Sequence, residues 1–122
     1  MNINIKTKGE LTVTDDLRAY IDEKISQLLK YLQNEDDGTI FFEVELQEGE
    51  EEQGRRYRAD ITVNAPGKRI HAVGWGEHLH AALDEAKDEL SRRIRREKKK
   101  ERVLLKKMGR KIKDILRFGK NF

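Results

Sequence analysis

Residues 77–102 read EHLHAALDEAKDELSRRIRREKKKER, and this segment decides the fold. Its apolar residues recur at steps of four, three, four and four, the spacing of one stripe along an α-helix: Leu79, Leu83, Ala86, Leu90 and Ile94. Acidic side chains occupy its first half and basic side chains its second half, the order that the helix macrodipole favours. The segment therefore predicts a long amphipathic helix that packs on a protein body.

The second half of this helix carries a ladder of basic side chains. At 100° per residue the ladder lies about 200° from the apolar stripe. Its members are Arg92, Arg95, Arg96, Lys99, Arg102 and Lys106. Since the apolar stripe lapses after Ile94 while the charge continues, we expect the helix to leave the body as a basic rod that meets a polyanion.

Charge is unevenly distributed along the 122 residues. The net charge is −9 over residues 1–91 and +12 over residues 92–122, which gives the overall +3. An acidic body with a basic arm is typical of proteins that bind nucleic acid or an anionic membrane. The absence of cysteine excludes disulfides and thiol chemistry. Because the chain begins with a polar strand and no apolar run approaches membrane-spanning length, we expect a cytoplasmic protein.

Alternation of apolar and polar residues predicts four strands, over residues 2–8, 39–46, 56–63 and 68–75. Thr14 is a good N-cap for a first helix of about five turns. The apolar stripe of that helix is Leu17, Ile21, Ile25, Leu28 and Leu32. Residues 47–54 are expected to form an acidic loop, and residues 64–67 a tight turn with Pro66 in its second place and Gly67 in its third.

The element order is then β-α-β-β-β-α. Short connections predict an antiparallel meander for the last three strands, and a helical crossover places the first strand parallel to its neighbour. Two helices with one apolar stripe each must cover the same sheet face. The fold class is therefore two-layer α+β, a four-stranded mixed sheet with two helices on one face and a polar, solvated outer face.

Beyond Arg102 the apolar register returns at Leu105, Met108, Ile112 and Ile115 or Leu116. This segment either continues the second helix or forms a separate amphipathic helix broken near Gly109, and the sequence leaves both alternatives open. We divide the chain into an α+β domain over residues 1–100 and a basic amphipathic helical tail over residues 101–122.

Residues that carry enzymatic or metal chemistry are few. His78 and His80 are two residues apart, the wrong spacing for one helix face, and with His71 they favour surface histidines over a metal site. The sequence contains no nucleophile elbow, no glycine-rich phosphate loop and no HExxH motif. We expect no enzymatic activity, no cofactor and no small-molecule substrate.

Two features remain as contacts for a polyanion. Trp75 and Phe41, on the outer sheet face, either stack on bases or pack against cross-strand neighbours, and the sheet lacks the adjacent aromatic pairs of an RRM platform. The basic arm either neutralises the acidic body or binds a polyphosphate partner.

Five short motifs follow one another over about four-fifths of the chain. They are Asn2-Ile3-Asn4-Ile5, the helix start at residues 14–18, Lys30-Tyr31-Leu32, the turn at residues 64–67, and Gly74 followed by the acid-led helix opening at residues 77–84. In this order they resemble the ribosome hibernation-promoting factors, also called ribosome-associated translation inhibitors, in their short form. That family is topologically related to double-stranded-RNA-binding domains.

The resemblance implies binding to the small ribosomal subunit in its decoding channel, which blocks messenger and transfer RNA and preserves idle ribosomes. It implies rRNA contacts from basic residues on both helices. The matching positions are Arg18, Lys24, Lys30, Arg92, Arg93, Arg95, Arg96, Lys99 and Lys100. The expected partner is the small subunit with its rRNA, the free protein is expected to be a monomer, and no membrane is involved.

Three alternatives stay open. One is a general module for structured RNA, which would bind naked duplex RNA as tightly as ribosomes. Another is an adaptor for an anionic membrane or a protein, acting through residues 103–118. The third is an acidic domain that its own basic arm neutralises.

Overall fold

A computed structural model of the protein describes residues 2–32, 37–52 and 55–119. Its elements follow the predicted β-α-β-β-β-α order, with two short 3-10 turns added between α1 and β2. The elements are β1 (Asn2–Lys8), α1 (Asp15–Ser26), η1 (Leu29–Leu32), η2 (Asp37–Thr39), β2 (Phe41–Glu52), β3 (Arg55–Ala65), β4 (Lys68–Gly76) and α2 (Leu79–Gly119).

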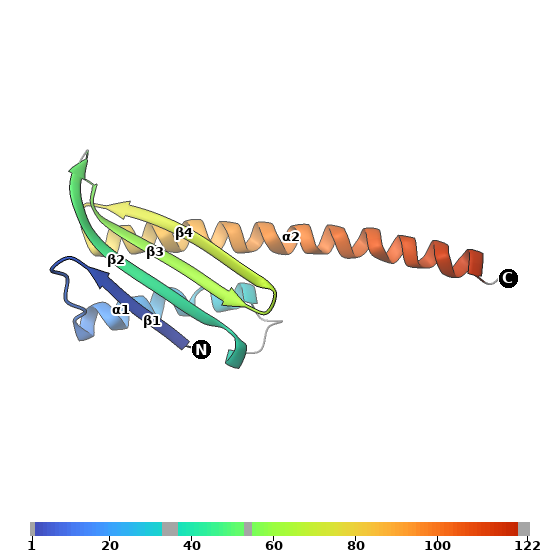
Figure 1. The fold of residues 1–122 in the computed structure, drawn as a ribbon, viewed down its shortest axis with the longest axis horizontal. Helices are drawn as coiled ribbons and strands as arrows, with labels where there is room; N and C mark the ends of the chain where they lie inside the picture. The colour runs from blue at the N-terminus through green and yellow to red at the C-terminus, as the bar shows by residue number, and fades with distance from the viewer. Residues whose placement is uncertain (1, 33–36, 53–54, 120–122) are drawn as a thin grey trace.

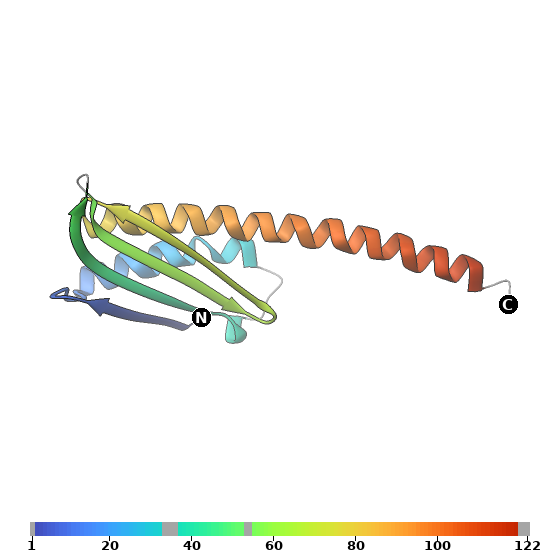
Figure 2. The same cartoon turned by 45° about the horizontal axis from the view of Figure 1, so that its top comes forward.

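The four strands form one sheet in the order β1-β2-β3-β4. β1 runs parallel to β2, whereas β2, β3 and β4 pair antiparallel, as the connection lengths predict. Both helices lie behind the same face of the sheet (Figures 1 and 2). The predicted two-layer α+β fold with a mixed sheet is confirmed.

The core lies between the sheet and the helices. Alternate residues of the strands point into it because side chains in a strand point alternately to its two faces. The apolar stripes of both helices meet these residues. The largest fully buried side chains include Phe42 and Ile61 from the sheet, Ile21 from α1, and Leu90 and Ile94 from α2.

Two glycines of β4 bring α2 unusually close to the sheet. A Cβ atom added at Gly74 would lie 2.3 Å from the carbonyl oxygen of Ala82 and from the amide nitrogen of Ala86. One added at Gly76 would lie 2.7 Å from the Cβ atom of Ala81. Small residues on both elements therefore set the distance between the helix and the strand.

The caps and the tight turn agree with the sequence. The Thr14 hydroxyl accepts a hydrogen bond of 3.1 Å from the Leu17 amide, which caps α1. Gly67 adopts a positive φ of 72° in the turn between β3 and β4. Pro66 pre-sets the preceding position of the same turn.

The first helix is shorter than predicted. α1 ends at Ser26 instead of continuing for a fifth turn. Leu28, just before the 3-10 turn η1, and Leu32, within η1, are nevertheless buried in the core. The Ser26 hydroxyl donates a 2.7 Å hydrogen bond to the Glu23 carbonyl, and the Leu28 amide bonds the carbonyl of Ile25, three residues back. These local hydrogen bonds tighten the backbone into a 3-10 turn, so apolar spacing alone overestimates the length of the helix.

The predicted acidic loop at residues 47–54 is largely wrong. β2 continues to Glu52 and β3 starts at Arg55, with an irregularity in the register between Glu48 and Glu52; residues 53–54 lie outside the described part. Backbone pairing needs no apolar side chain, and Glu48 pairs in register with Tyr57. The paired strands of the hairpin therefore extend beyond the apolar residues from which the strand ends were predicted.

α2 is one continuous helix of 41 residues, so its tail neither breaks nor bends away at Gly109. Its buried stripe ends at Ile94, and the helix then projects far beyond the sheet (Figures 1 and 2). Of the returning apolar residues, Leu105, Met108 and Ile112 are exposed, and the side chains of Ile115 and Leu116 lie outside the described part. Among the described residues, no helix is both long enough and apolar enough to cross a bilayer.

Candidate nucleic-acid interface

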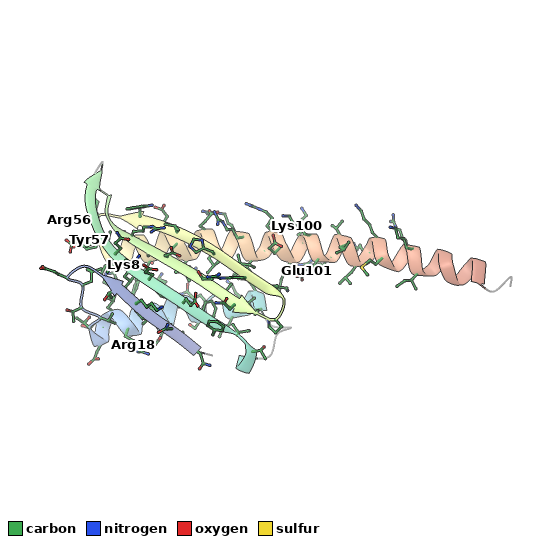
Figure 3. The ribbon with its side chains drawn as sticks, viewed as in Figure 1. Lys8, Arg18, Arg56, Tyr57, Lys100 and Glu101 are labelled. Atoms are coloured by element: carbon green, nitrogen blue, oxygen red, sulfur yellow. The ribbon has the colours of Figure 1, made fainter. Side chains whose placement is uncertain are left out.

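The nine basic residues expected to contact RNA lie on the helical layer, on the side of the molecule away from the outer sheet face. α1 carries Arg18 and Lys24, η1 carries Lys30, and α2 carries Arg92, Arg93, Arg95, Arg96, Lys99 and Lys100. All but Lys24 are exposed. Figure 3 labels Arg18 on α1 and Lys100 on α2, well apart along this surface.

A tyrosine joins η1 to α2 in the middle of this surface. The Nζ atom of Lys30 lies 5.0 Å from the ring centroid of Tyr31, and the guanidinium carbon of Arg95 lies 5.4 Å from it. Hydrogen bonding with Ser91 and then with Lys30 lowers the pKa of Tyr31 below its ordinary value. Tyr31 thereby holds cations from two elements beside each other.

Lys24 belongs to a different cluster, between α1 and α2. Its Nζ atom lies 3.2 Å from the carboxylate of Asp84, which also accepts a hydrogen bond from the Tyr20 hydroxyl. Partial burial acts to raise the pKa of Asp84, but the hydrogen bonds from Tyr20 and Lys24 outweigh it and hold that pKa below its ordinary value. Lys24 therefore fixes the two helices together and has less freedom to meet a phosphate than the sequence implies.

Several cations of α2 bind acids of their own helix. The guanidinium groups of Arg92 and Arg93 lie 2.7 and 3.1 Å from the carboxylate of Glu89, and their hydrogen bonds lower the pKa of that acid. Lys100 lies 3.5 Å from Glu97. Exposed pairs of this kind contribute little stability, so a phosphate can replace the carboxylate. Five of the nine make no ion pair with any described residue: Lys30 and Arg95, which contact the Tyr31 ring instead, and Arg18, Arg96 and Lys99.

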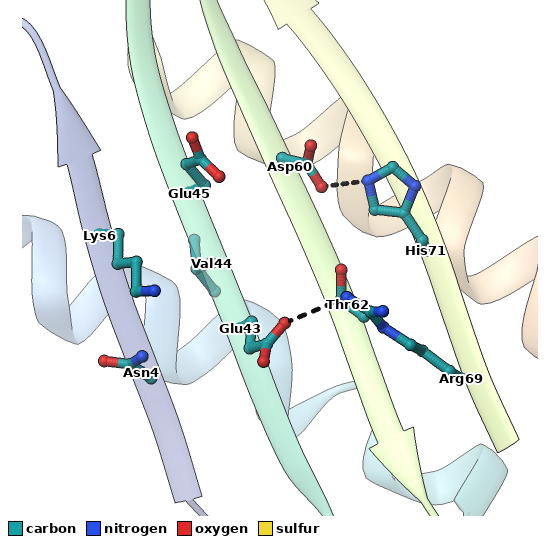
Figure 4. A pocket seen from close by; sticks show the side chains of 9 residues that line it. All are labelled: Asn4, Lys6, Glu43, Val44, Glu45, Asp60, Thr62, Arg69 and His71. Carbon is teal, nitrogen blue, oxygen red and sulfur yellow. Dashed lines mark hydrogen bonds and ion pairs between the residues drawn. The ribbon is translucent and has the colours of Figure 1, made fainter.

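The outer sheet face presents a different balance of charge. Figure 4 shows Glu43, Glu45 and Asp60 in a shallow hollow, with Arg69 near Glu43 and His71 bonded to Asp60. The distance from the Arg69 guanidinium to the carboxylate of Glu43 is 3.7 Å. Acids and bases of this face therefore largely neutralise one another across the strands.

The two aromatic residues of the outer face are partly exposed, Phe41 by 42% and Trp75 by 37%. The guanidinium carbon of Arg58, the cross-strand neighbour of Trp75, lies 5.7 Å from the centroid of its ring. This contact agrees with packing against a cross-strand neighbour. Base stacking by either residue stays a prediction.

His71 lies on the sheet, whereas His78 and His80 lie near each other at the start of α2, with ring centroids 6.3 Å apart. His71 pairs with Asp60 on the sheet, His78 accepts a 3.2 Å hydrogen bond from the Ala81 amide, and the rings of His80 and Tyr20 meet edge to face at 4.3 Å. Within residues 2–32, 37–52 and 55–119, no three histidine or carboxylate side chains gather as metal ligands.

Sequence reasoning placed the cations on the helices but missed what orders them. The contacts of Tyr31 with Arg95 and Ser91 join residues about 60 positions apart. The sequence signal was weak, because Tyr31 sits in a short motif with no obvious partner. The acid-led pairs of Glu89 with Arg92 and Arg93 follow directly from helical spacing.

Comparison with known proteins identifies the class to which this fold and its basic helical layer belong. Residues 3–102 match the sequence model of the family described as sigma 54 modulation protein / S30EA ribosomal protein. The match covers well over half of the chain, so the protein belongs to this family.

Individual relatives carry names that concern the ribosome. The ribosome hibernation promotion factor of Deinococcus radiodurans is 33% identical over 84 residues, which are 69% of this chain and 42% of that protein. The ribosome hibernation promoting factor of Escherichia coli K12 is 27% identical over 100 residues, 82% of this chain and 96% of that protein. The chain thus spans under half of the first relative and nearly all of the second.

Solved structures support the fold. The N-terminal domain of Protein Y from Thermus thermophilus is 30% identical and superposes with a TM-score of 0.64, covering 79% of this chain and 98% of that domain. A ribosomal subunit interface protein from Coxiella burnetii, at 17% identity and a TM-score of 0.59, shares the fold. The similarity to double-stranded-RNA-binding domains stays a prediction.

Proposed function

We propose that the protein is a ribosome-associated translation inhibitor that binds the small subunit and preserves idle ribosomes. One observation carries the proposal: in a family whose relatives are named hibernation promoting factors, this chain exposes a row of cations along both helices. The opposite face of the sheet largely neutralises its own charge through the ion pairs Lys8–Glu45, Arg58–Asp60 and Arg69–Glu43. The helical layer is therefore the surface suited to a polyanion.

The chemistry needed is phosphate recognition on a rigid scaffold. Folded RNA is recognised largely through its shape and its phosphates, with few contacts to bases. Lys30 and Arg95, ordered by Tyr31, supply donors that do not depend on base sequence. Arg96 and Lys99, which make no ion pair within the described part of the chain, supply further donors of this kind. We infer that these residues contact rRNA in the decoding channel, where the bulk of the domain excludes messenger and transfer RNA.

The acidic remainder of the domain contributes specificity. Residues 1–91 carry a net charge of −9, so RNA that approaches from another side is repelled. We propose that residues 1–100 form the ribosome-binding domain, a monomer when free, and act in the cytoplasm. The basic tail over residues 101–122 is proposed to extend the polyanion contact.

The test reverses the charge of Arg92, Arg95, Arg96 and Lys99 to Glu. The variant is expected to keep the fold, because all four side chains are exposed, and to lose binding to purified small subunits. For the unmodified protein, 6–10 phosphate contacts predict a roughly 10³–10⁵-fold fall in affinity between about 50 and 200 mM salt. Unchanged binding of the reversed variant would remove these residues from the interface.

A parallel titration uses naked duplex RNA. A ribosome-specific factor is expected to prefer the assembled subunit, because the arrangement of its phosphates is matched to folded rRNA. Equal affinity for duplex RNA and subunits would instead indicate a general RNA-binding module.

A further inference from the structure

β4 is an edge strand, and α2 runs alongside it. Between them lies a groove of about 550 Å³, which we call the strand-side groove. It is lined by Gly67, Lys68, Arg69, Ile70, His71, Arg93, Arg96, Glu97, Lys100 and Glu101. Gly67 from the tight turn and Lys68 at the start of β4 lie outside the nine basic positions expected to contact RNA.

Cations enter this groove from both walls. From the turn, the Nζ atom of Lys68 lies 2.8 Å from the carboxylate of Glu101 on α2. From the helix, Arg93 donates a 2.5 Å hydrogen bond to the carbonyl of His71, so its guanidinium lies against the open edge of β4. Figure 3 labels Lys100 and Glu101 on α2 near this end of β4.

The groove lies on a different flank of α2 from the Tyr31 cluster. Arg95, which contacts the Tyr31 ring, and Lys100, which lines the groove, are five positions apart, or about 140° around the helix. Arg93 and Lys100 are seven positions apart and lie on nearly the same side. Of the ladder that the sequence predicts, Arg95 therefore lies on the Tyr31 flank, while Arg96 lines the groove together with Arg93 and Lys100, which are not part of the ladder.

We propose that the strand-side groove binds a backbone phosphate of the RNA, so that α2 is contacted on both flanks; this inference rests on the proposed function. Lys68, Arg93, Arg96 and Lys100 outnumber the two carboxylates of the groove, and Arg96 has no ion-pair partner among the described residues.

The two carboxylates fit this role. Glu101 holds Lys68 against α2, in a pair whose lysine side chain is only 24% exposed. Glu97 makes a looser contact of 3.5 Å with Lys100, and both of those side chains are largely exposed. A phosphate is expected to compete with Glu97 for Lys100 and to leave the Lys68–Glu101 pair in place.

The experiment compares three double variants that each remove two positive charges. Lys68→Gln with Lys100→Gln alters the groove, and Arg92→Gln with Lys99→Gln alters the solvent-exposed side of α2. Lys6→Gln with Lys8→Gln alters the outer sheet face, where neither residue lines the groove. Affinity for purified small subunits is measured against salt concentration. Since each lost phosphate contact lowers the salt slope by about one, the groove variant is expected to lower the slope by one to two.

The controls separate this inference from the proposed function. An outer-face variant that binds as the parent protein does, beside a weakened groove variant, supports the groove. If the solvent-side variant weakens binding while the groove variant matches the outer-face control, the inference is wrong and the proposed function stands. If the unmodified protein does not bind subunits, the proposed function itself fails.

A gain of binding gives an independent readout. Glu97→Gln removes a carboxylate that competes with phosphate, so it is expected to raise subunit affinity several-fold. Glu45→Gln, which removes a carboxylate paired with Lys8 on the outer sheet face, is the matched control. An unchanged affinity for Glu97→Gln would contradict the inference.

To distinguish phosphate sources, the amide signals of Gly67 and Lys68 are followed by NMR during titration with duplex RNA and with tripolyphosphate. Shifts with tripolyphosphate alone would assign the groove to free phosphates and overturn the RNA proposal.

Discussion

At the scale of single residues, the fold depends most directly on Gly74. Its missing side chain lets β4 approach the backbone of α2 at Ala82 and Ala86. A methyl group there would have to displace backbone atoms of the helix, not the flexible end of a side chain. The long helix, and with it the basic surface, is therefore positioned by a residue that carries no chemistry.

Gly74→Ala is expected to destabilise the domain by about 1–3 kcal/mol or more, the usual cost of overpacking a core. Gly109→Ala is the matched control, since an added Cβ atom there meets nothing within 4 Å and favours the helix. Chemical denaturation followed by circular dichroism measures both. Equal stability of the two variants would contradict the close packing of β4 on α2.

The pair of Lys24 with Asp84 predicts a pH dependence. Because the folded pKa of Asp84 lies below its ordinary value near 3.9, its stabilising effect is complete above the unfolded pKa and disappears as pH falls through the folded pKa. The Asp84 side chain is 45% exposed, so solvent screening limits the effect to roughly 0.2–1 kcal/mol.

Asp84→Asn is therefore expected to lower stability by this small amount at pH 7 and to match the parent protein in strong acid. Asp22→Asn, an exposed acid of α1 with no ion pair among the described residues, is expected to change little at either pH. Denaturant titrations at several pH values measure the difference. A deficit for Asp84→Asn that persists unchanged into strong acid would be the contradicting result.

At the scale of elements, the sequence predicts strands and helices well where one face is buried. The apolar stripe from Leu83 to Ile94 is enough to place α2 on the sheet, because packing against the sheet buries these side chains away from water. The sequence pattern overestimates the length of α1, whose last turn tightens into η1. It underestimates the length of the β2–β3 hairpin, whose end pairs through the backbone alone. The hydrophobic pattern indicates which side chains are buried. Both errors in element length occur where backbone hydrogen bonds, not buried side chains, determine where the element ends.

The projecting part of α2 is the element whose role is most open to experiment. Deleting residues 103–122 removes seven basic residues but keeps Glu101, the partner of Lys68. Since the buried stripe of α2 ends at Ile94, the shortened protein is expected to unfold at nearly the same denaturant concentration. Its affinity for small subunits is expected to fall, with a shallower salt dependence.

The same deletion tests whether the arm neutralises the acidic body. If that is its main role, the shortened protein will be markedly less stable, while its RNA binding will hardly change. Matched measurements of unfolding and of subunit binding on one preparation distinguish the two. Substituting Leu105, Met108 and Ile112 by Ser, with vesicles of acidic lipid as the probe, tests the membrane alternative separately.

At the scale of the whole molecule, the outer sheet face and the helical layer differ in how far their charged side chains are paired. The outer face pairs its acids and bases across strands, whereas the helical layer leaves Arg18, Arg96 and Lys99 without ion pairs among the described residues. The sequence predicts this division from the clustering of bases on the helices. It does not predict the grouping of those bases around Tyr31 or beside β4, because both depend on contacts between distant segments.

The central claim is that the domain occupies the path of messenger RNA on the small subunit. The most direct measurement is co-sedimentation of the protein with purified small subunits, at low and moderate salt, with and without messenger RNA. We predict saturable binding near one protein per subunit that messenger RNA weakens. Binding that messenger RNA leaves unchanged would contradict occlusion of the decoding channel, and absence of binding at low salt would contradict ribosome association altogether.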